Sequence, residues 1–185
     1  MVKDIVAQIA RYAEGESLYI AIKNGQDKTD EQVKAKLDVI LACYNAVIYD
    51  VATNYYDYVK KVEVPVETLN ISNFDEPIIK IVNIQDGYGK KINYSVEGDV
   101  ITVEKSTFTF VYQTIPKVQT MNESYVFKYS AIGKNVIIYG ALAEYCLIQN
   151  RIEEAQNWES KYRQAIEVRR DYKKRRLKAG KKWGL

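Results

Sequence analysis

The spacing of apolar residues divides the chain into three parts. Over residues 1–57 apolar side chains recur every three or four positions, which is the repeat of an amphipathic helix. Between residues 58 and 116 the repeat shortens to two, as in strands, and over residues 117–168 the helical repeat returns. The pattern predicts an α+β protein in which a helical body contains an inserted β subdomain.

The N-terminal part is expected to hold a short helix and a long one. The short helix spans Val2 to about Ala13 and is followed by a polar stretch through Gly25 and Asp27. The long helix begins at a capping box formed by Thr29 and Gln32, and about 27 residues would make it roughly 40 Å long. Its apolar stripe is expected to contain Val33, Leu37, Ile40, Leu41, Tyr44, Ile48, Val51 and Tyr55.

Residues 58–116 consist of short segments rich in Val, Ile, Thr and aromatic residues. Turn signals separate them at Asp86-Gly87, Gly89, Glu97-Gly98-Asp99 and Lys105-Ser106. The spacing predicts a meander of four to six strands, forming a small antiparallel sandwich or barrel. Pro65 places the first strand at an edge or at a bulge, because proline cannot donate to a ladder.

A helical hairpin is expected to complete the helical body. After a loop near residues 117–132, the segment behind Gly133 is apolar on most sides, which predicts a buried helix. Asn150, with Glu153 three residues later, is expected to cap the next helix, folded antiparallel to the first. The stripe of that helix is Ile152, Ala155, Trp158, Tyr162, Ala165 and Ile166.

The stripe fades after Val168, where a strongly basic segment begins. Residues 169–182 hold nine Lys or Arg and one Asp, a local charge of +8, so the net charge of +3 leaves −5 for the remainder. We expect an extended basic C-terminal arm over residues 169–185, helical at first and loosened at Gly180, that docks on a partner. The docking residues are predicted to be Arg169, Arg170, Lys173, Lys174, Arg175, Arg176, Lys178, Lys181, Lys182, Trp183 and Leu185.

Two other interpretations of the arm stay open. Clustered Lys and Arg are all that is needed to neutralise phosphates, so the arm could bind nucleic acid without reading its sequence. It could also be a solvated tail. A membrane role is disfavoured, because an interfacial helix needs a continuous apolar face and only Tyr172 and Leu177 are apolar before Trp183. The longest near-apolar stretch is interrupted by Glu144 and is too short to span a bilayer, so no membrane segment is expected.

The sequence offers no combination of residues typical of catalysis. It contains no histidine, which removes the commonest general base and metal ligand. Cys43 and Cys146 lie in apolar helical stretches, so we expect buried, reduced thiols without a metal. The DGYGKK segment at 86–91 has one residue between its glycines where a phosphate-binding loop needs four, which favours a hairpin turn. We therefore expect no enzyme, no cofactor and no metal site.

The order of elements resembles that of bacteriophage head-to-tail connector, or portal adaptor, proteins, a group that includes tail tubular protein A of short-tailed phages. Two stretches look like the family's β region: EPIIKIVNIQD and KKINYSVEGDVITVEKSTFTFVYQTIPK. A third, GALAEYCLIQNRIEEAQNWESKYRQAI, looks like its alanine-rich helix and the amphipathic helix that follows. The resemblance covers most of residues 30–170 and is one of pattern.

The resemblance implies a structural protein of the virion neck, assembled in the host cytoplasm as a ring, usually of twelve copies. Its partners would be the portal protein and a downstream tail or ring protein, with non-specific contact to genomic double-stranded DNA. The arm would dock on the portal through Arg175, Arg176, Lys181, Lys182, Trp183 and Leu185. A ring needs head-to-tail contacts that close, and an arm that orders only on binding would leave the free protein monomeric or weakly associated. The alternative function is a sequence-independent nucleic-acid-binding module using the same arm.

Overall fold

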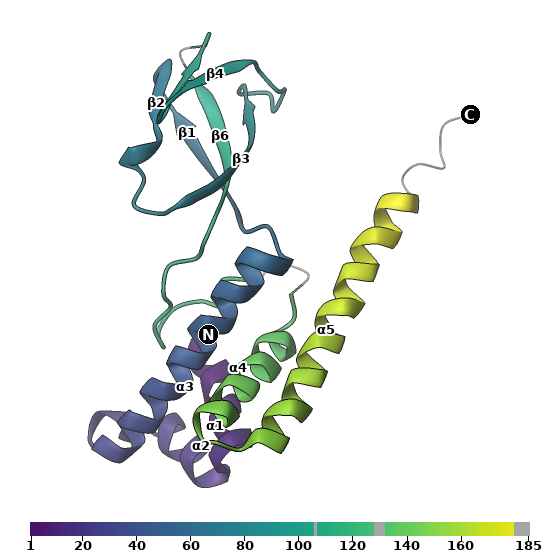
Figure 1. The fold of residues 1–185 in the computed structure, drawn as a ribbon. Coiled ribbons are helices and arrows are strands. Elements are labelled where there is room, and N and C mark those ends of the chain that lie inside the picture. Colours follow the sequence, from purple (N-terminus) through teal and green to yellow (C-terminus); the bar gives the residue numbers. More distant parts are fainter. Residues whose placement is uncertain (106, 128–131, 180–185) are drawn as a thin grey trace. The chain divides into compact units, whose positions relative to one another are not determined.

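The computed structural model describes residues 1–105, 107–127 and 132–179, with the backbone alone for 169–179. Within these residues it contains five α-helices and two three-stranded antiparallel sheets, neither of them closed, which confirms the α+β class. The chain divides into a helical unit, Met1–Val51 with Val118–Leu185, and a β unit, Ala52–Lys117 (Figure 1). The β unit is thus inserted into the helical one, where sequence analysis placed an insertion at 58–116.

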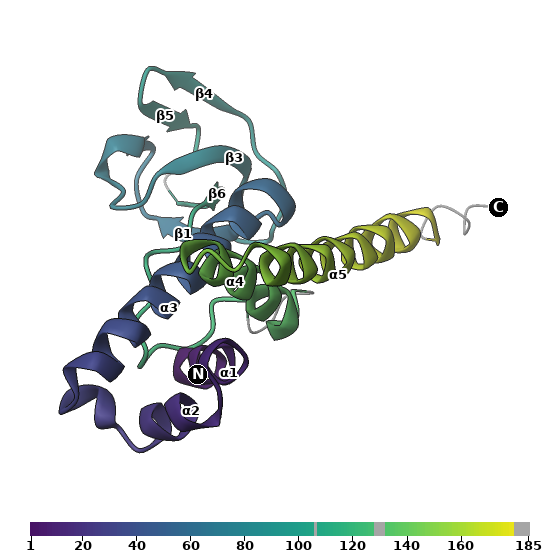
Figure 2. The same cartoon turned by 60° about the horizontal axis from the view of Figure 1, so that its bottom comes forward.

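The helical unit is arranged around one central helix. Its helices are α1 (Val2–Glu14), α2 (Glu16–Lys23), α3 (Glu31–Asp50), α4 (Lys134–Ile148) and α5 (Ile152–Ala179). α4 packs against α1, α3 and α5, while α1 and α2 lie side by side (Figure 2). Three neighbours explain why α4 is apolar on most sides, since each of them buries a different face of it.

α2 is an element that sequence analysis missed, having assigned its residues to a polar stretch. The backbone at Gly15 has φ 96°, a conformation that favours glycine, and it separates α1 from α2. Leu18, Ala21 and Ile22 are buried at helical spacing. The segment is short and half polar, so its repeat is weak in the sequence alone.

α3 begins one residue later than the capping box predicts. The Asp30 carboxylate accepts hydrogen bonds from the backbone N–H groups of Gln32 and Val33, at 2.9 and 3.2 Å. The Thr29 hydroxyl instead donates to the Gln26 carbonyl at 3.3 Å. The capping box was therefore wrong, because the aspartate satisfies the same N–H groups and adds a negative charge at the positive end of the helix.

The predicted stripe of the long helix is partly correct. Leu37, Ile40, Tyr44 and Ile48 are buried along α3. After Asp50 the chain continues as a π-helix, Val51–Tyr55, whose wider turn shifts the side chains that follow. Tyr55 is 49% exposed as a result, so its assignment to the buried stripe was wrong.

The β unit is built from two sheets that share one core. β1 (Val59–Val64), β6 (Phe108–Thr114) and β3 (Ile78–Gln85) form the first in that spatial order, and β2 (Thr68–Asn70), β5 (Val100–Val103) and β4 (Tyr94–Glu97) form the second. Pro65 follows directly after β1, which lies at an edge as predicted. The core contains Val64, Ile84, Ile101, Val103, Phe108, Phe110 and Tyr112, contributed by both sheets.

β3 departs from simple alternation. Ile78, Ile81 and Ile84 pair with β6 residues on the core side although they are three positions apart. Register shifts between Ile78 and Lys80, and between Ile81 and Asn83, each insert an extra residue. Two bulges thus turn the period-two pattern expected for this strand into a period of three.

The segment after the β unit is bound to the first and third helices. The N–H groups of Val2 and Lys3 donate to the carbonyls of Glu123 and Met121, at 3.0 and 3.1 Å. These bonds satisfy N–H groups at the start of α1 that have no partner inside the helix. The Tyr44 hydroxyl of α3 donates to Oε1 of buried Gln119 at 2.7 Å.

The turn between α4 and α5 uses Asn150 in a different role from the one predicted. Asn150 has φ 57°, the left-handed conformation that terminates helices. Its N–H donates to the Leu147 carbonyl at 3.0 Å, and the Arg151 N–H donates to the Cys146 carbonyl at 2.8 Å. Asn150 therefore ends α4 and does not cap α5, which begins at Ile152. Ile152 itself is exposed, so its place in the predicted stripe was wrong.

Candidate interaction surfaces

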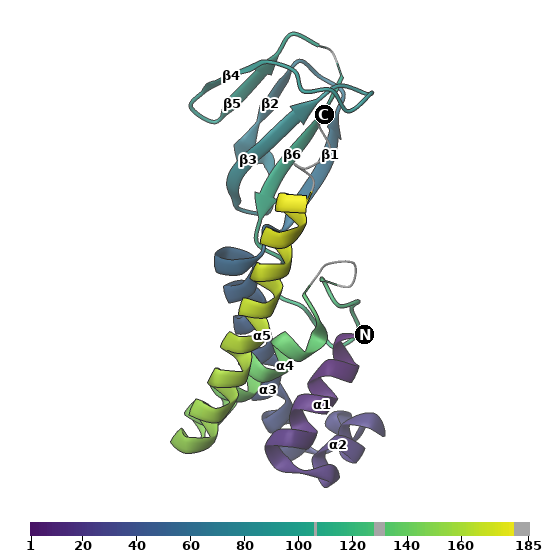
Figure 3. The same ribbon diagram turned by 90° about the vertical axis from the view of Figure 1, so that its right-hand side faces the viewer.

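α5 is the longest helix that the structure describes. It has 28 residues, whereas α4 has 15. The two helices run antiparallel, and α5 continues beyond the N-terminal end of α4 (Figure 3). Ala155, Tyr162 and Ile166 are buried, and Val168 is 63% exposed. Among the residues of α5 whose side chains are described, 152–168, the last buried one is thus Ile166, at the middle of the helix, and the basic residues of the predicted arm all follow it.

The first half of α5 is fixed by close packing around Gly140 of α4. A Cβ atom added at Gly140 would lie 2.7 Å from Cγ1 of Val47 and 3.1 Å from the Tyr162 ring. The Tyr162 hydroxyl donates to Asp50 at 2.6 Å, and Trp158 stacks on Tyr139 at 5.8 Å between ring centroids. These contacts join α5 to α3 and α4, so the direction in which α5 leaves the body is well determined.

The predicted docking residues fall into two groups. Arg169, Arg170, Lys173, Lys174, Arg175, Arg176 and Lys178 belong to α5, for which the structure gives the backbone at these positions. Lys181, Lys182, Trp183 and Leu185 lie outside the described residues. Seven of the eleven therefore share one helix, on which residues three or four apart lie on the same face.

The elbow between α4 and α5 is bound to the end of α1. The Arg151 guanidinium donates to the Ala13 carbonyl at 3.1 Å, one of the carbonyls that α1 leaves unpaired. The same guanidinium lies over the Tyr145 ring, 5.7 Å from its centroid. The Tyr145 hydroxyl donates to Glu14 at 2.7 Å. A positive charge at the carboxyl end of a helix is favourable, so the contact holds the elbow in place.

Glu14 is the centre of a small charge cluster beside this elbow. Its second oxygen accepts from the Lys36 ammonium of α3 at 2.6 Å. The hydrogen bond from Lys36 holds the pKa of Glu14 below its ordinary value, and the bond from Tyr145 acts in the same direction against the effect of burial. Burial and the hydrogen bond to Glu14 together raise the pKa of the Tyr145 hydroxyl. The cluster joins three helices and has the character of a structural anchor.

The DGYGKK segment forms a hairpin turn, as predicted. The Asp86 carboxylate accepts from the N–H groups of Tyr88 and Lys90 at 3.0 and 2.9 Å, and Gly89 has φ 81°. These backbone bonds, together with Lys105 at 3.2 Å, lower the pKa of Asp86. Because a carboxylate already occupies the N–H groups of the turn, they are not available to hold a phosphate.

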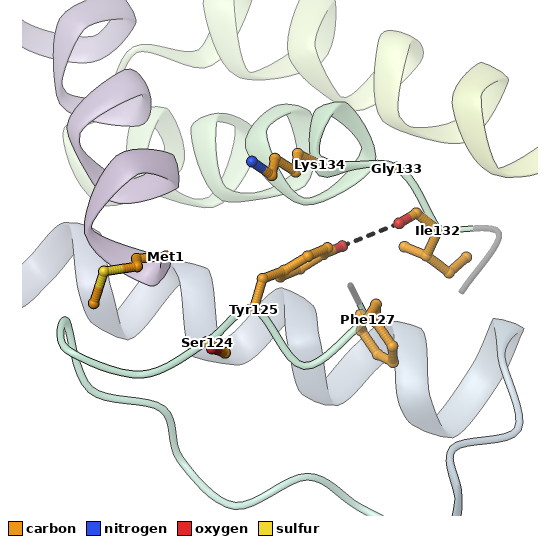
Figure 4. Close-up of a pocket in the computed structure, with 7 residues that line it drawn as sticks. All are labelled: Met1, Ser124, Tyr125, Phe127, Ile132, Gly133 and Lys134. Atoms are coloured by element: carbon orange, nitrogen blue, oxygen red, sulfur yellow. Dashed lines mark hydrogen bonds between the residues drawn. The ribbon is translucent and has the colours of Figure 1, made fainter. Parts of the chain in front are cut away.

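A hollow of about 350 Å³ lies between the start of α1 and the start of α4. It is lined by Met1, Ser124, Tyr125, Phe127, Ile132, Gly133 and Lys134 (Figure 4). Tyr125 directs its hydroxyl to the Ile132 carbonyl at 3.3 Å, and burial raises the pKa of that hydroxyl. Among the described lining residues, Lys134 has the one charged side chain, and a single lysine beside a hydroxyl that is already hydrogen-bonded supplies no acid–base pair.

The two cysteines are free and buried, in α3 and α4. Burial raises the pKa of the Cys43 thiol to about 11, so the nucleophilic thiolate is disfavoured. The described residues hold no group of three or more carboxylate or thiol side chains placed to bind a metal ion. Among the described helices, none is both long and apolar enough to cross a bilayer.

One surface that sequence analysis did not single out is the edge of the second sheet at β4. All four β4 residues are exposed, and they include Tyr94 and Val96. Alternating apolar residues beside Gly98 indicated a strand there but could not show that its outer side would be left uncovered. Its neighbour Tyr88, at the tip of the preceding turn, is 98% exposed.

Comparison with known proteins assigns neither a family nor a function to the chain. No protein-family model matches the chain, and no curated protein matches its sequence. Within the described residues, two candidate interaction surfaces are the continuation of α5 and the open edge at β4.

Proposed function

We propose that this protein is a head-to-tail connector of a bacteriophage, a non-enzymatic structural component of the virion neck. About twelve copies would form a ring beneath the portal and continue the DNA channel, as the resemblance to that family implies. The observation that carries the proposal is α5, in which Ile166 is the last buried side chain among those described, through Val168, while the helix continues to Ala179. A helix gains little by continuing beyond its core contacts unless the extension has a partner.

The basic arm is the proposed docking element. Residues 169–182 carry a charge of +8, and the residues of α5 among them follow a helix that is firmly held at its base by Gly140, Tyr162 and Arg151. A rigid base reduces the entropy lost on docking, and charge steers the encounter. Trp183 and Leu185 would then supply the apolar anchors, with the arm ordering on the portal.

The β insertion fits the same proposal. Two small sheets with a shared core are compatible with the small sandwich or barrel that the strand spacing predicts. An inserted unit with open sheet edges can contact a neighbouring copy or the downstream tail component without disturbing the helical unit. Contact with genomic DNA would be through charge alone, without sequence specificity.

The test is attachment to the portal protein of the same phage, measured by co-sedimentation with the full chain and with residues 169–185 deleted. The deletion begins after Ile166, the last buried residue among the side chains of α5 that are described, and so retains every core contact described for this helix. We expect the full chain to attach and the deletion to remain folded but unattached. Attachment of the deletion would refute the docking role of the arm.

The same two proteins distinguish the alternative function. A nucleic-acid-binding module would bind double-stranded DNA without a portal, with affinity falling steeply as salt rises and vanishing on deletion of the arm. Tight DNA binding together with failure to attach to the portal would favour that alternative. Weak DNA binding with firm portal attachment is the result that the connector proposal predicts.

A further inference from the structure

The four edges of the two sheets differ in how they are protected. A strand edge presents unpaired N–H and C=O groups, and proteins guard it with proline, lysine, bulges or short length. β1 ends next to Pro65 and carries Lys60 and Lys61. β3, at the other edge of that sheet, has two register shifts. β2, at one edge of the second sheet, is three residues long.

The fourth edge, β4, is also short, at four residues, but it lacks the other three protections. Its four residues, Tyr-Ser-Val-Glu, contain no proline or lysine and pair with β5 without a register shift. Figure 3 shows β4 beside β5 with no strand of the β unit on its other side. A regular, uncovered edge is the feature that permits pairing with another chain.

The apolar face of this sheet continues to its edge. Tyr94 and Val96 pair with Val103 and Ile101 of β5, so they lie on the same face as these two core residues. Val103 and Ile101 are buried, whereas Tyr94 and Val96 are 42% and 47% exposed. An additional strand would extend this face and cover part of both side chains.

We propose that β4 pairs antiparallel with β4 of a second copy of this chain. The two-fold axis lies between the Ser95 residues of the two copies, which oppose each other. Charge determines the direction. Lys90 and Lys91 precede the strand, while Glu97 and Asp99 lie at its other end. Antiparallel pairing brings the basic end of one copy beside the acidic end of the other, whereas parallel pairing would place like charges together. Within the described residues, neither Lys91 nor Glu97 has an ion-pair partner that this contact would have to break.

The pleat determines the register. Side chains of directly opposed residues lie on the same face of a sheet, so the positions of two opposed residues must differ by an even number. At the two-fold axis a residue therefore opposes its own copy. When the two Ser95 residues oppose each other, Tyr94 of each copy opposes Val96 of the other. The contact then contains two pairs of an aromatic and a β-branched side chain.

Lys91 precedes the paired residues and its backbone already pairs with Gln85 of β3, while Asp99 lies in the turn after β4. The opposite charges of the two copies therefore approach one another at the ends of the paired strands, outside the ladder itself.

The contact is small. A pair of four-residue strands buries less than the roughly 1,200 Å² of a stable interface, so the dimer is weak and forms at high concentration. A two-fold contact cannot close a head-to-tail ring, so this pairing is additional to the ring contacts proposed above and does not depend on them. At high concentration it would associate the free protein in pairs.

Disulfide formation at the axis tests the geometry in the full chain. Ser95→Cys places two thiols opposite each other across the pair, and Tyr88→Cys is the control, because Tyr88 is 98% exposed but lies outside the strand. Under mild oxidation we expect Ser95→Cys to form covalent dimers at least about tenfold faster, because paired strands hold the sulfur atoms within disulfide reach. Equal rates, or faster reaction of the control, would overturn the proposal.

A charge exchange tests the orientation by sedimentation equilibrium. Lys91→Glu should weaken the dimer about two- to tenfold, since it places a negative charge near the acidic strand end of the other copy in both symmetric contacts. Adding Glu97→Lys should restore most of the loss, and Val96→Lys should abolish pairing. Thermal unfolding of each variant controls for folding. A double variant that associates no better than Lys91→Glu would refute the antiparallel contact, and unchanged portal attachment would separate that failure from the proposed function.

Discussion

The side chain of Asn45 bonds to both backbone polar groups of Gln119. The Gln119 N–H donates to Oδ1 of Asn45 at 2.7 Å, and Nδ2 of Asn45 donates to the Gln119 carbonyl at 3.0 Å. Asn45 thus pairs with the backbone N–H and C=O of Gln119 as the backbone of a neighbouring strand would. This pair attaches the segment after the β unit to α3, at the point where the helical unit resumes.

Removing this side chain should destabilise the helical unit. Asn45→Ala leaves the N–H and the carbonyl of buried Gln119 without these partners, which should lower the free energy of unfolding by about 2 kcal/mol. Denaturant unfolding measures the effect. Asn157→Ala, at an exposed position of α5, is the control and should change stability by less than about 0.5 kcal/mol. Similar effects for both variants would contradict the role given to Asn45.

Gly140 should not tolerate a larger side chain. Gly140→Ala brings a methyl group to 2.7 Å from Val47 Cγ1, and the clash should outweigh the better helix propensity of alanine. We expect a loss of about 1–2 kcal/mol in unfolding free energy, partly recovered in the double variant with Val47→Ala. Gly87→Ala has open space and serves as the control. A stabilised Gly140→Ala protein would show that α3, α4 and α5 pack less closely than described.

The Glu14 carboxylate should contribute to stability above its titration range. Its pKa is held below the ordinary value in the folded protein, so its contribution is fully present above the unfolded pKa and is lost as pH falls through the folded one. We expect wild type to exceed Glu14→Gln in melting temperature at pH 7 and the difference to shrink between about pH 5 and pH 3. Glu153→Gln, at an exposed glutamate, is the control. A difference that stays constant with pH would contradict the charge cluster.

The two thiols should not react in the folded protein. Cys43 is buried, and burial raises its pKa to about 11, so little thiolate exists at pH 8. We expect a thiol-specific chromogenic reagent to label neither cysteine until denaturant is added, and then to label two per chain. Tyr88→Cys supplies an exposed thiol that should react at once. Prompt labelling of the wild-type protein would show that the core around α3 and α4 opens easily.

The sequence was informative where a pattern is long and local. The stripe of α3 through Leu37, Tyr44 and Ile48, and the all-round apolar α4, are determined by burial along one helix. Element boundaries were less predictable, because neighbouring residues compete for them. Asp30 takes the cap from Thr29, and Asn150 ends α4 where a cap for α5 was expected.

Features that depend on distant parts of the chain could not be predicted. The two bulges of β3 are defined by β6, some thirty residues away, and they convert the spacing of Ile78, Ile81 and Ile84 into one face. The contact of Arg151 with the Ala13 carbonyl joins opposite ends of the sequence. The open edge at β4 follows from the order of strands in the sheet, which local alternation does not specify.

The central claim is that this chain forms a ring attached to a portal by its basic arm. Electron microscopy of the purified protein mixed with its portal tests this most directly. The account predicts a closed ring of about twelve copies beneath the portal, present with the full chain and absent when residues 169–185 are deleted. Images that show portals without bound rings, or rings attached equally well by the deleted chain, would contradict it.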